Sequence, residues 1–412
     1  MAEADPQEDL KRRALEYHAR APAGKLSVIP SKPCISQEDL SLAYTPGVAA
    51  PVREIAADPD KAYDYTAKGN LVAVVSNGTA VLGLGNVGPL AGKPVMEGKA
   101  LLFKRFADID AFDIEVQARD AEHFIDVVAA IAPGFGGINL EDIAAPVCFQ
   151  VEEALQTRLE IPVFHDDQHG TAVIVAAALR NALELQGKEL GRVKVAIVGA
   201  GAAGLAIARM LRTLGVTEVF LSDLHGVLHS GRADLSAWHQ PFAVAPQDWD
   251  LAAMLRGADV VIGVSVRGAI PEAALSTLAS KPVIFALANP DPEVDPAVAR
   301  RLCPDAIIAT GRSDLPNQVN NVLGFPFLFR GALDCRARRI NPPMLLAAVD
   351  ALARLAREPV PDMVRAAYGL TATQGLAFGP EYIIPKPLDP RLRQWVSGAV
   401  TVAARESGVA RR

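Results

Sequence analysis

The most constraining feature of the sequence is a glycine-rich turn at residues 199–204, which stands between a strand-like and a helix-like segment. Residues 193–198 before it are mostly apolar, as expected of a buried strand. Gly199, Gly201 and Gly204 match the dinucleotide-binding fingerprint, whose glycines permit a tight turn, close approach of a pyrophosphate and packing of the helix on the strand. The turn therefore predicts a Rossmann-type domain. The alternative is a turn that needs its glycines sterically and binds no ligand.

The residues after the turn support the same interpretation. A helical pattern opens at Ala202, where backbone N–H groups would face the phosphates. A strand-like segment follows at residues 218–222, and Asp223 stands 19 residues after Gly204 (223 − 204 = 19), near the acidic position of the fingerprint. Asp223 would hydrogen-bond a ribose 2′-hydroxyl and repel a 2′-phosphate, which favours NAD. Arg232 and neighbouring histidines could compensate, so NAD and NADP both remain open.

A second match to the glycine pattern, at residues 83–88, carries less weight. It also follows a strand-like segment, but Pro89, Gly92 and Pro94 then interrupt any helix. We interpret this match as a loop and expect a helix to begin only at about Val95.

Strand-like and helix-like segments alternate along most of the chain, which predicts an α/β fold. The strand candidates lie at residues 71–75, 79–83, 111–116, 193–198, 218–222, 260–264, 283–287 and 306–309. We expect two domains. An N-terminal α/β domain at residues 1–165 carries catalytic and substrate groups, and a Rossmann-type doubly wound parallel-sheet domain at residues 166–412 ends in a helical tail.

Two acidic pairs stand upstream of the glycine-rich turn. Glu141 and Asp142 follow an apolar, glycine-containing approach, and Asp166 and Asp167 follow the apolar run at 161–164. Carboxylates placed after buried strands cost free energy unless they are paired or bind a metal. Three carboxylates around a divalent cation suit Mg²⁺ or Mn²⁺. Helix capping is the alternative, because Asp142 and Asp167 each precede a helix-like segment, the second expected from about residue 171.

A zinc site is a further alternative at the same place. His165 and His169 are four residues apart and could share a metal if they lay on a helix. Gly170 and the preceding strand argue against a helix there.

Composition excludes several classes of protein. The formal net charge of 41 − 47 = −6 argues against a nucleic-acid-binding protein. The four cysteines include no CxxC pair, so neither a disulfide framework nor a zinc ribbon is expected. The uncharged stretch at residues 69–92 contains six glycines, which is typical of strands and turns rather than of a membrane span. We expect a cytoplasmic protein without nucleic-acid or membrane partners.

Several separate strings, in the expected order, resemble malic enzyme in its compact bacterial form. They lie at residues 41–49, 81–86, 96–100, 139–142, 164–171 and 318–321, and the resemblance runs from about Leu15 to Leu392. It implies oxidative decarboxylation of (S)-malate to pyruvate and CO₂ with NAD or NADP and Mg²⁺ or Mn²⁺. Decarboxylation of oxaloacetate is an expected side activity. We also expect a homo-oligomer, a dimer or larger.

The resemblance implies roles for the residues that match these strings. Glu141, Asp142 and Asp167 correspond to the metal ligands, Lys99 to the general base and Tyr44 to the general acid. A base must take the C2 hydroxyl proton as hydride leaves for the nicotinamide. A lysine of pKa ~10.4 would need that pKa lowered by ~3 units to act near neutrality.

Further positions match the family or depart from it. Asn289 and Asn321 correspond to contacts with substrate or nicotinamide, and Asn289 also to the cofactor site. Ala80 stands where larger eukaryotic-type malic enzymes carry an arginine, so the group that binds the substrate carboxylate is open. The sequence ends at Arg412, without the phosphotransacetylase-like extension of some bacterial relatives, and control that depends on that extension is expected to be absent.

Other functions remain open at this point. One is another metal-assisted hydroxy-acid dehydrogenase or a plain oxaloacetate decarboxylase. Another is a non-catalytic protein that senses dinucleotides.

Overall fold

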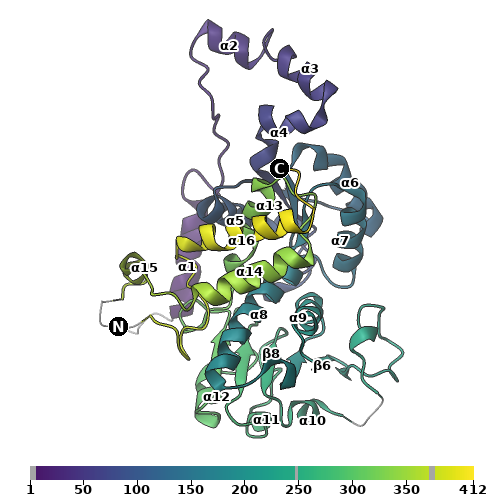
Figure 1. Cartoon of the computed structure of the whole chain (residues 1–412), viewed down its shortest axis with the longest axis vertical. Helices are drawn as coiled ribbons and strands as arrows, with labels where there is room; N and C mark the ends of the chain where they lie inside the picture. Colours follow the sequence, from purple (N-terminus) through teal and green to yellow (C-terminus); the bar gives the residue numbers. More distant parts are fainter. Residues whose placement is uncertain (1–5, 246–248, 371–375) are drawn as a thin grey trace.

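The computed structural model describes residues 6–245, 249–370 and 376–412. Its core consists of two separate sheets, one for each half of the chain, arranged along the long axis of the molecule (Figure 1). The first sheet is entirely parallel, with the order β2-β1-β3-β4. Its strands are β1 (Leu71–Ser76), β2 (Asp110–Glu115), β3 (Gly137–Leu140) and β4 (Val163–His165).

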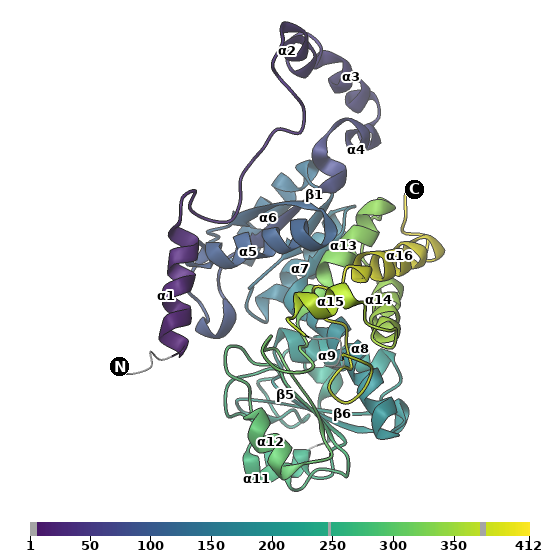
Figure 2. The same cartoon turned by 90° about the vertical axis from the view of Figure 1, so that its left-hand side faces the viewer.

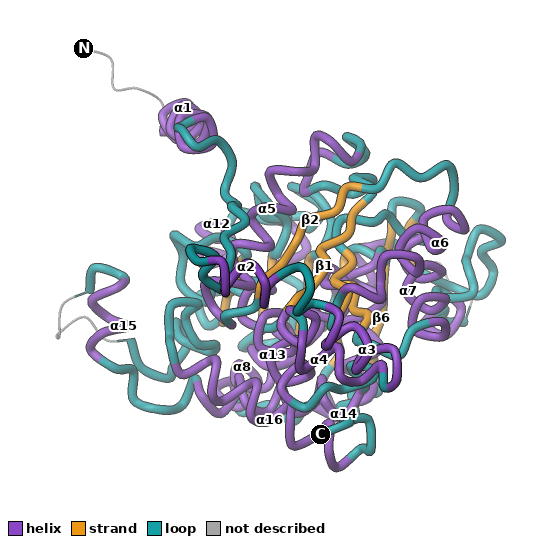
Figure 3. The backbone as a smooth tube through the Cα atoms, turned by 90° about the horizontal axis from the view of Figure 1, so that it is seen from above, coloured by secondary structure: helices purple, strands orange, loops and turns teal. Residues whose placement is uncertain are grey.

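Helices cover both faces of this sheet, as Figure 3 shows for β1 and β2. They include α5 (Pro89–Ala107), α6 (Ala121–Ile131) and α7 (Val147–Arg158). A strand covered on both faces needs apolar residues throughout, and five of the six residues of β1 are buried. The uncharged stretch that raised a membrane question is therefore a buried strand and its turns. Within the described residues, no helix is both long and apolar enough to cross a membrane.

The second sheet has the order β10-β9-β8-β5-β6-β7. Its strands are β5 (Lys194–Val198), β6 (Glu218–Asp223), β7 (Gly226–Val227), β8 (Val260–Gly263), β9 (Val283–Ala286) and β10 (Ile307–Thr310), and all pairs except β6 with β7 are parallel. The strand order reverses between β5 and β8, which is the position where doubly wound sheets bind ligands. The predicted fold class is confirmed.

Helices tie the two sheets together. Helix α8 (Asp166–Gln186) leaves β4, has 14 buried residues and packs against α9 (Ala202–Thr213). The C-terminal helices α13 (Phe325–Asp334), α14 (Pro342–Leu355) and α16 (Arg391–Glu406) return to the first layer (Figures 1 and 2). There Phe103 of α5 meets Phe325 and Phe329 with ring centroids 4.8 and 5.3 Å apart. The boundary between residues 165 and 166 stays a prediction.

The start of α5 differs from the prediction. The helix begins at Pro89, not near Val95, and contains both Gly92 and Pro94. A proline at the first helical position removes an N–H that has no partner there anyway, so the helix can open at Pro89. Pro94 removes only one further helical hydrogen bond, and its carbonyl accepts one from Lys25 Nζ (2.6 Å). The interpretation of residues 83–88 as a loop holds, apart from a single 3-10 turn at Leu82–Leu84. The strand expected at residues 79–83 is wrong, because this segment forms only an isolated bridge between Val81 and Gly85.

An N-terminal arm stands away from both layers (Figures 1 and 2). It carries α2 (Gln37–Ala43), α3 (Ala49–Ala57) and α4 (Ala62–Tyr65), and none of the three helices contains a buried residue. The remaining helices are α1 (Pro6–Ala19), α10 (Leu251–Leu255), α11 (Glu272–Leu275), α12 (Pro296–Leu302) and α15 (Asp362–Ala367).

Candidate active site

The candidate site forms where β3 and β4 end. Parallel pairing places Leu140 beside His165 at the carboxyl ends of these strands. The acidic pairs that follow, residues 141–142 and 166–167, therefore leave the sheet at the same edge. The register between two neighbouring strands thus brings together carboxylates from separate parts of the chain.

Three of these carboxylates converge. Glu141, Asp142 and Asp167 each offer one oxygen within 4.8 Å of the other two. The backbone N–H of Asp142 donates to Asp167 Oδ2 (2.9 Å), and Asp142 itself has φ +52°, a left-handed conformation that is uncommon outside glycine. Asp142 Oδ2 is buried and has no hydrogen-bond partner among the described residues.

The electrostatics of this cluster fit a cation. Burial, reinforced by the neighbouring charges of Asp167 and Glu141, raises the pKa of Asp142 to about 9. Burial also raises the pKa of Glu141 and of Asp167 above their usual ranges. Buried oxygen ligands that repel one another and leave a lone pair unsatisfied are the donor set that Mg²⁺ or Mn²⁺ needs. The residues present therefore fit the divalent cation that the sequence implied.

The alternatives for these residues are not supported. Helix α8 begins at Asp166, so Asp167 lies within its first turn, and α7 is preceded by Pro146 rather than by Asp142. The expectation that no helix begins before Gly170 is therefore wrong. The two histidines still do not share a site, because His169 Nε2 lies 2.9 Å from Glu152 Oε2, whereas His165 Nε2 faces Asp167 Oδ2 at 3.4 Å.

Lys99 lies beside the carboxylates and is almost fully buried. It projects from α5, with its Nζ 2.8 Å from Glu141 Oε1, 2.5 Å from Asp166 Oδ2 and 4.1 Å from the ring centroid of Phe325. Burial alone would lower the pKa of Lys99, but Asp166 and Glu141 outweigh it and raise that pKa above its usual range. These side chains alone therefore do not give Lys99 the lowered pKa that a general base requires.

No separate role was predicted for Asp166 from the sequence, but its side chain contacts two other residues of the site. It is fully buried, and its Oδ2 accepts hydrogen bonds from Lys99 Nζ and from Asn321 Nδ2 (2.6 Å). Asn321 follows the second sheet, so this carboxylate links both halves of the chain. Its position directly before Asp167, at the start of α8, was the available signal.

The glycine-rich turn has the geometry that the fingerprint requires. Gly199 has φ +118°, and a Cβ there would lie 2.4 Å from the Val264 carbonyl oxygen. A Cβ on Gly204 would lie 1.8 Å from the carbonyl oxygen of Gly199, whereas one on Gly201 would meet nothing within 4 Å. Two glycines are therefore needed for packing. The third leaves open space at the start of α9, where Ala202 is the first helical residue.

Asn289 lies after β9, close to two glycines from other segments. A Cβ on Gly311 would approach its side-chain nitrogen to 2.7 Å, and a Cβ on Gly83 would approach its backbone oxygen to 3.0 Å. The loop at residues 83–88 therefore meets the second sheet layer at Asn289. Asn321 and Asn289 each connect that layer to the first.

Comparisons with known proteins agree along the whole chain. Family models of the malic enzyme N-terminal domain and the malic enzyme NAD-binding domain match residues 23–156 and 168–366. The NADP-dependent malic enzyme of Halomonas elongata is 56% identical over 98% of this chain and 96% of its own length. The chain belongs to the malic enzyme family.

Other malic enzymes give the same picture. The NAD-dependent malic enzyme of Rhizobium meliloti is 54% identical over 98% of the chain, which spans only about half (52%) of that relative's length. The crystal structure of malic enzyme from Pyrococcus horikoshii matches with a TM-score of 0.88 at 46% identity, covering 98% of this chain and 92% of the other. Membership confirms the resemblance seen in the motifs, and with it the reaction class of NAD(P)-linked, metal-dependent oxidative decarboxylation. The roles of individual residues stay predictions.

Tyr44, the predicted general acid of a malic enzyme, is not brought to the site within one chain. It lies at the end of α2 in the arm, and 69% of its surface is exposed. Among the described residues, no side-chain hydrogen bond or ion pair joins it to Lys99 or to the carboxylates. The role of Tyr44 therefore stays a prediction, and nothing in the motif shows which copy of the chain this residue would serve.

Two further positions bear on coenzyme and substrate. Asp223, at the end of β6, accepts a bidentate pair of hydrogen bonds from Arg232 at 2.7 and 2.8 Å. Burial opposes the charge of Asp223, but Arg232 outweighs burial and lowers its pKa. Ala80 donates its backbone N–H to the carbonyl oxygen of Asp142 (3.0 Å), so this position adjoins the carboxylate cluster but offers only a methyl group.

Proposed function

We propose that this chain catalyses the oxidative decarboxylation of malate, with Lys99 as base. The observation that carries the proposal is the buried chain of contacts from Lys99 through Asp166 to Asn321, beside three converging carboxylates. These contacts connect the carboxylates at the edge of the first sheet to Asn321, which follows the sheet that carries the glycine-rich turn. A small diacid bound there would face an amine and oxygen ligands at once.

Each group has a defined task in this reaction. Glu141, Asp142 and Asp167 would hold Mg²⁺ or Mn²⁺, which when bound polarises the C2 oxygen and stabilises the charge left by departing CO₂. Gly199, Gly201 and Gly204 would position the dinucleotide that accepts the hydride. Lys99 takes the C2 hydroxyl proton.

The contacts of Lys99 explain how it could act as a base. The two carboxylates that keep its proton in place include Glu141, which is one of the proposed metal ligands. A bound cation competes for that negative charge and so removes part of the force that raises the pKa of Lys99. Asp166, which also accepts a hydrogen bond from Asn321, holds the amine in position.

The experiment is an assay of malate-dependent coenzyme reduction with and without Mn²⁺, on the full chain and on Lys99→Ala. We expect turnover to require Mn²⁺ and to fall by about 10³-fold in the variant, within the range for loss of a general acid or base. Lys104→Ala is the matched control, because Lys104 lies on the same helix with its side chain exposed. Normal turnover by Lys99→Ala, or coenzyme binding without turnover, would contradict the proposal.

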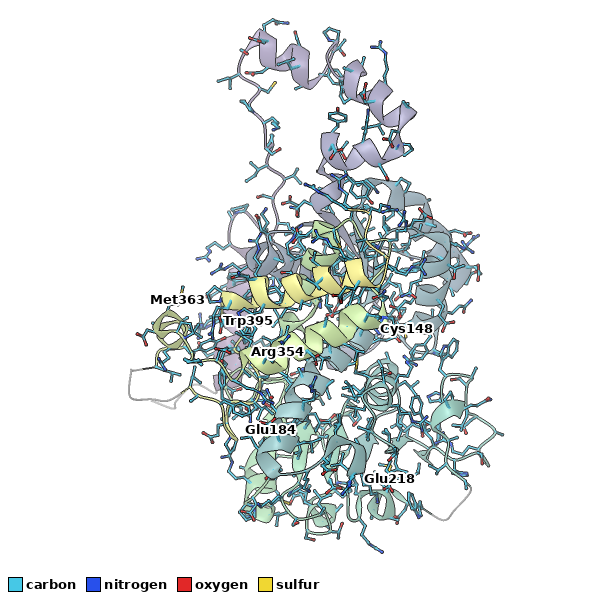
Figure 4. The ribbon with its side chains drawn as sticks, viewed as in Figure 1. Cys148, Glu184, Glu218, Arg354, Met363 and Trp395 are labelled. Atoms are coloured by element: carbon cyan, nitrogen blue, oxygen red, sulfur yellow. The ribbon has the colours of Figure 1, made fainter. Side chains whose placement is uncertain are left out.

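We further propose that the active unit is a homo-oligomer, at least a dimer, in which the arm of one copy supplies Tyr44 to the site of another. The arm exposes Leu40, Leu42 and Val52 as well as Tyr44, and Figure 4 shows its side chains standing in open space. A row of exposed apolar residues on helices without buried contacts is typical of a surface that a second copy covers. The body exposes Leu90 at the start of α5, the helix that carries Lys99.

Coenzyme choice is proposed to depend on the pair Asp223–Arg232. While paired, Asp223 can still accept from a ribose hydroxyl, and Arg232 is held back from a 2′-phosphate. Asp223→Ala removes one of the two carboxylates that hold Arg232, the other being Asp234, and is expected to raise the NADP⁺ over NAD⁺ preference by about tenfold in kcat/KM. Arg232→Ala is expected to shift the preference the opposite way. Equal shifts in the same direction would contradict this role.

We place the enzyme in the cytoplasm. All four cysteines are free, and three of them are buried, as in proteins of reducing compartments.

A further inference from the structure

A cavity lies at the seam between the two layers, and its lining includes none of the proposed metal ligands, Lys99 or the glycine-rich turn. Its volume is about 440 Å³, within the range of small-molecule sites. The walls come from α7, α9, the start of α14 and the loop at residues 237–242. Figure 4 labels Cys148 on α7, the neighbour of the wall residue Phe149.

One wall of this cavity is aromatic. The rings of Phe149 and Trp238 lie 5.1 Å apart and are tilted by 32°. The indole N–H of Trp238 donates to Glu153 Oε1 (3.0 Å), which fixes the ring to α7. Phe242 and Leu345 continue the apolar lining. Such a surface favours a flat, apolar ligand body.

A charged side chain, Arg209 of α9, also lines this cavity. Its guanidinium is half-buried, 5.8 Å from the ring centroid of Phe149, and donates one hydrogen bond to Gln168 Oε1 (3.1 Å). Among the residues that the structure describes, no carboxylate lies within salt-bridge distance of it. Burial lowers the pKa of Arg209, but a guanidinium stays charged and keeps further donors available.

The carboxylates at this cavity are already engaged. Glu152 Oε1 accepts from the backbone N–H of His165 (2.9 Å), and its Oε2 accepts from Gln168 (3.0 Å) and lies 2.9 Å from His169 Nε2. Glu153 is bonded to Trp238. Arg209 is therefore the charged group of the cavity with hydrogen-bond donors to spare, and these donors fit the carboxylate of a ligand.

The cavity is connected to both halves of the catalytic site. Gln168 and His169 follow the proposed metal ligand Asp167 directly on α8. On the other wall, His239 in the loop beside Trp238 bonds the carbonyl oxygen of Ala200 in the glycine-rich turn (3.0 Å). A ligand between these walls would act on elements that position the metal site and the coenzyme site.

We propose that this cavity is an effector site for a small aromatic monocarboxylate, whose ring packs on Phe149 and Trp238 and whose carboxylate pairs with Arg209. Occupancy fixes α7 against α9 and thereby changes the affinity of the catalytic site. The binding half of this proposal does not depend on which reaction the enzyme catalyses.

The first test measures binding to the full chain by calorimetry, with indole-3-acetate as the probe and indole-3-acetamide as its neutral match. The acid is expected to bind about tenfold more tightly than the amide, because only the acid forms a charge-assisted hydrogen bond with Arg209. Equal affinities, or no binding of the acid, would overturn the proposal without any variant.

Variants then locate the site. Arg209→Met is expected to abolish the difference between acid and amide, and Arg209→Lys to keep part of it. Arg330→Met is the control, because Arg330 is a largely buried arginine of α13 outside the cavity. Loss of the difference in the control, or its survival in Arg209→Met, would overturn the assignment.

The regulatory half has its own readout. Saturating indole-3-acetate is expected to change the KM for malate or coenzyme by about fivefold, without competing with malate. Competition with malate would place the acid in the catalytic site, and unchanged kinetics would overturn the claim that the site is regulatory.

Discussion

The N-terminal arm and the carboxylate cluster with Lys99 differ in how far their side chains are buried. Helices α2 to α4 contain no buried residue, whereas Lys99, Glu141, Asp142 and Asp166 are all buried. Strand register and the packing of α5 and α8 bring the carboxylate cluster and Lys99 together within a single copy of the chain. The arm has no such support within its own copy. The difference teaches that a motif can predict a catalytic role for a residue that the fold of a single chain leaves outside the site.

The largest expected effect comes from a change in the buried carboxylate cluster. Asp142→Asn removes one of three converging carboxylates, so Mn²⁺ affinity is expected to fall by about 100-fold and turnover further still. Titration with Mn²⁺ by calorimetry, alongside malate turnover, measures both. Exposed Asp314→Asn is the control, and unchanged Mn²⁺ affinity in Asp142→Asn would exclude Asp142 as a ligand.

A change at Tyr44 in the exposed arm should lower turnover without changing metal affinity. Tyr44→Phe removes only a hydroxyl, and turnover is expected to fall by about 10²-fold, as for loss of a general acid. Because Tyr44 is mostly exposed within its own copy, Mn²⁺ affinity and coenzyme affinity should stay unchanged. Steady-state kinetics with a thermal melt separates these effects. Tyr65→Phe, elsewhere on the arm and also exposed, is the control, and full activity of Tyr44→Phe would remove Tyr44 from the mechanism.

A smaller effect concerns stability and pH. In the metal-free protein the pKa of Asp142, about 9, lies above the ordinary value of 3.8, so the folded state favours its protonated form. Stability should therefore fall as pH rises from about 4 through 9. Mn²⁺ binds the deprotonated form, so its stabilising effect should be larger at pH 8 than at pH 5.5, up to about 3 kcal/mol at 100-fold excess over Kd. Thermal melts with and without Mn²⁺ measure this, and a larger effect at pH 5.5 would contradict it.

The sequence predicted the parts that depend on local pattern. Apolar runs placed β1, β2, β5, β6, β8, β9 and β10 within a residue of their bounds, and glycine spacing identified the turn before α9. Strands β3 and β4 were given no bounds and β7 was not predicted, because these strands have only two to four residues. The early start of α5 was missed because Pro89 and Pro94 look like helix breakers, although a first-turn proline costs little. The start of α8 was placed too late for a similar reason, since Gly170 hid a helix that begins at Asp166.

The parts that depend on packing could not be predicted. Nothing in the local sequence around Asp166 shows that its side chain bonds Lys99 and Asn321, because those contacts join segments 67 and 155 residues apart. The raised pKa of Lys99 likewise follows from two neighbouring carboxylates that outweigh its burial, and no motif encodes this arrangement. The pairing of Asp223 with Arg232 was only one of several compensations that the sequence allowed.

The most direct test of the central claim is complementation between two inactive variants. Tyr44→Phe and Lys99→Ala are mixed, partly unfolded together and refolded so that copies exchange, and malate turnover is measured. If the arm of one copy completes the site of its neighbour, each mixed dimer contains one intact site, and activity should recover to about one quarter of the wild-type value with random pairing. If Tyr44 serves its own copy, no site is intact in any pairing and activity should stay at the level of the separate variants, which would contradict the account.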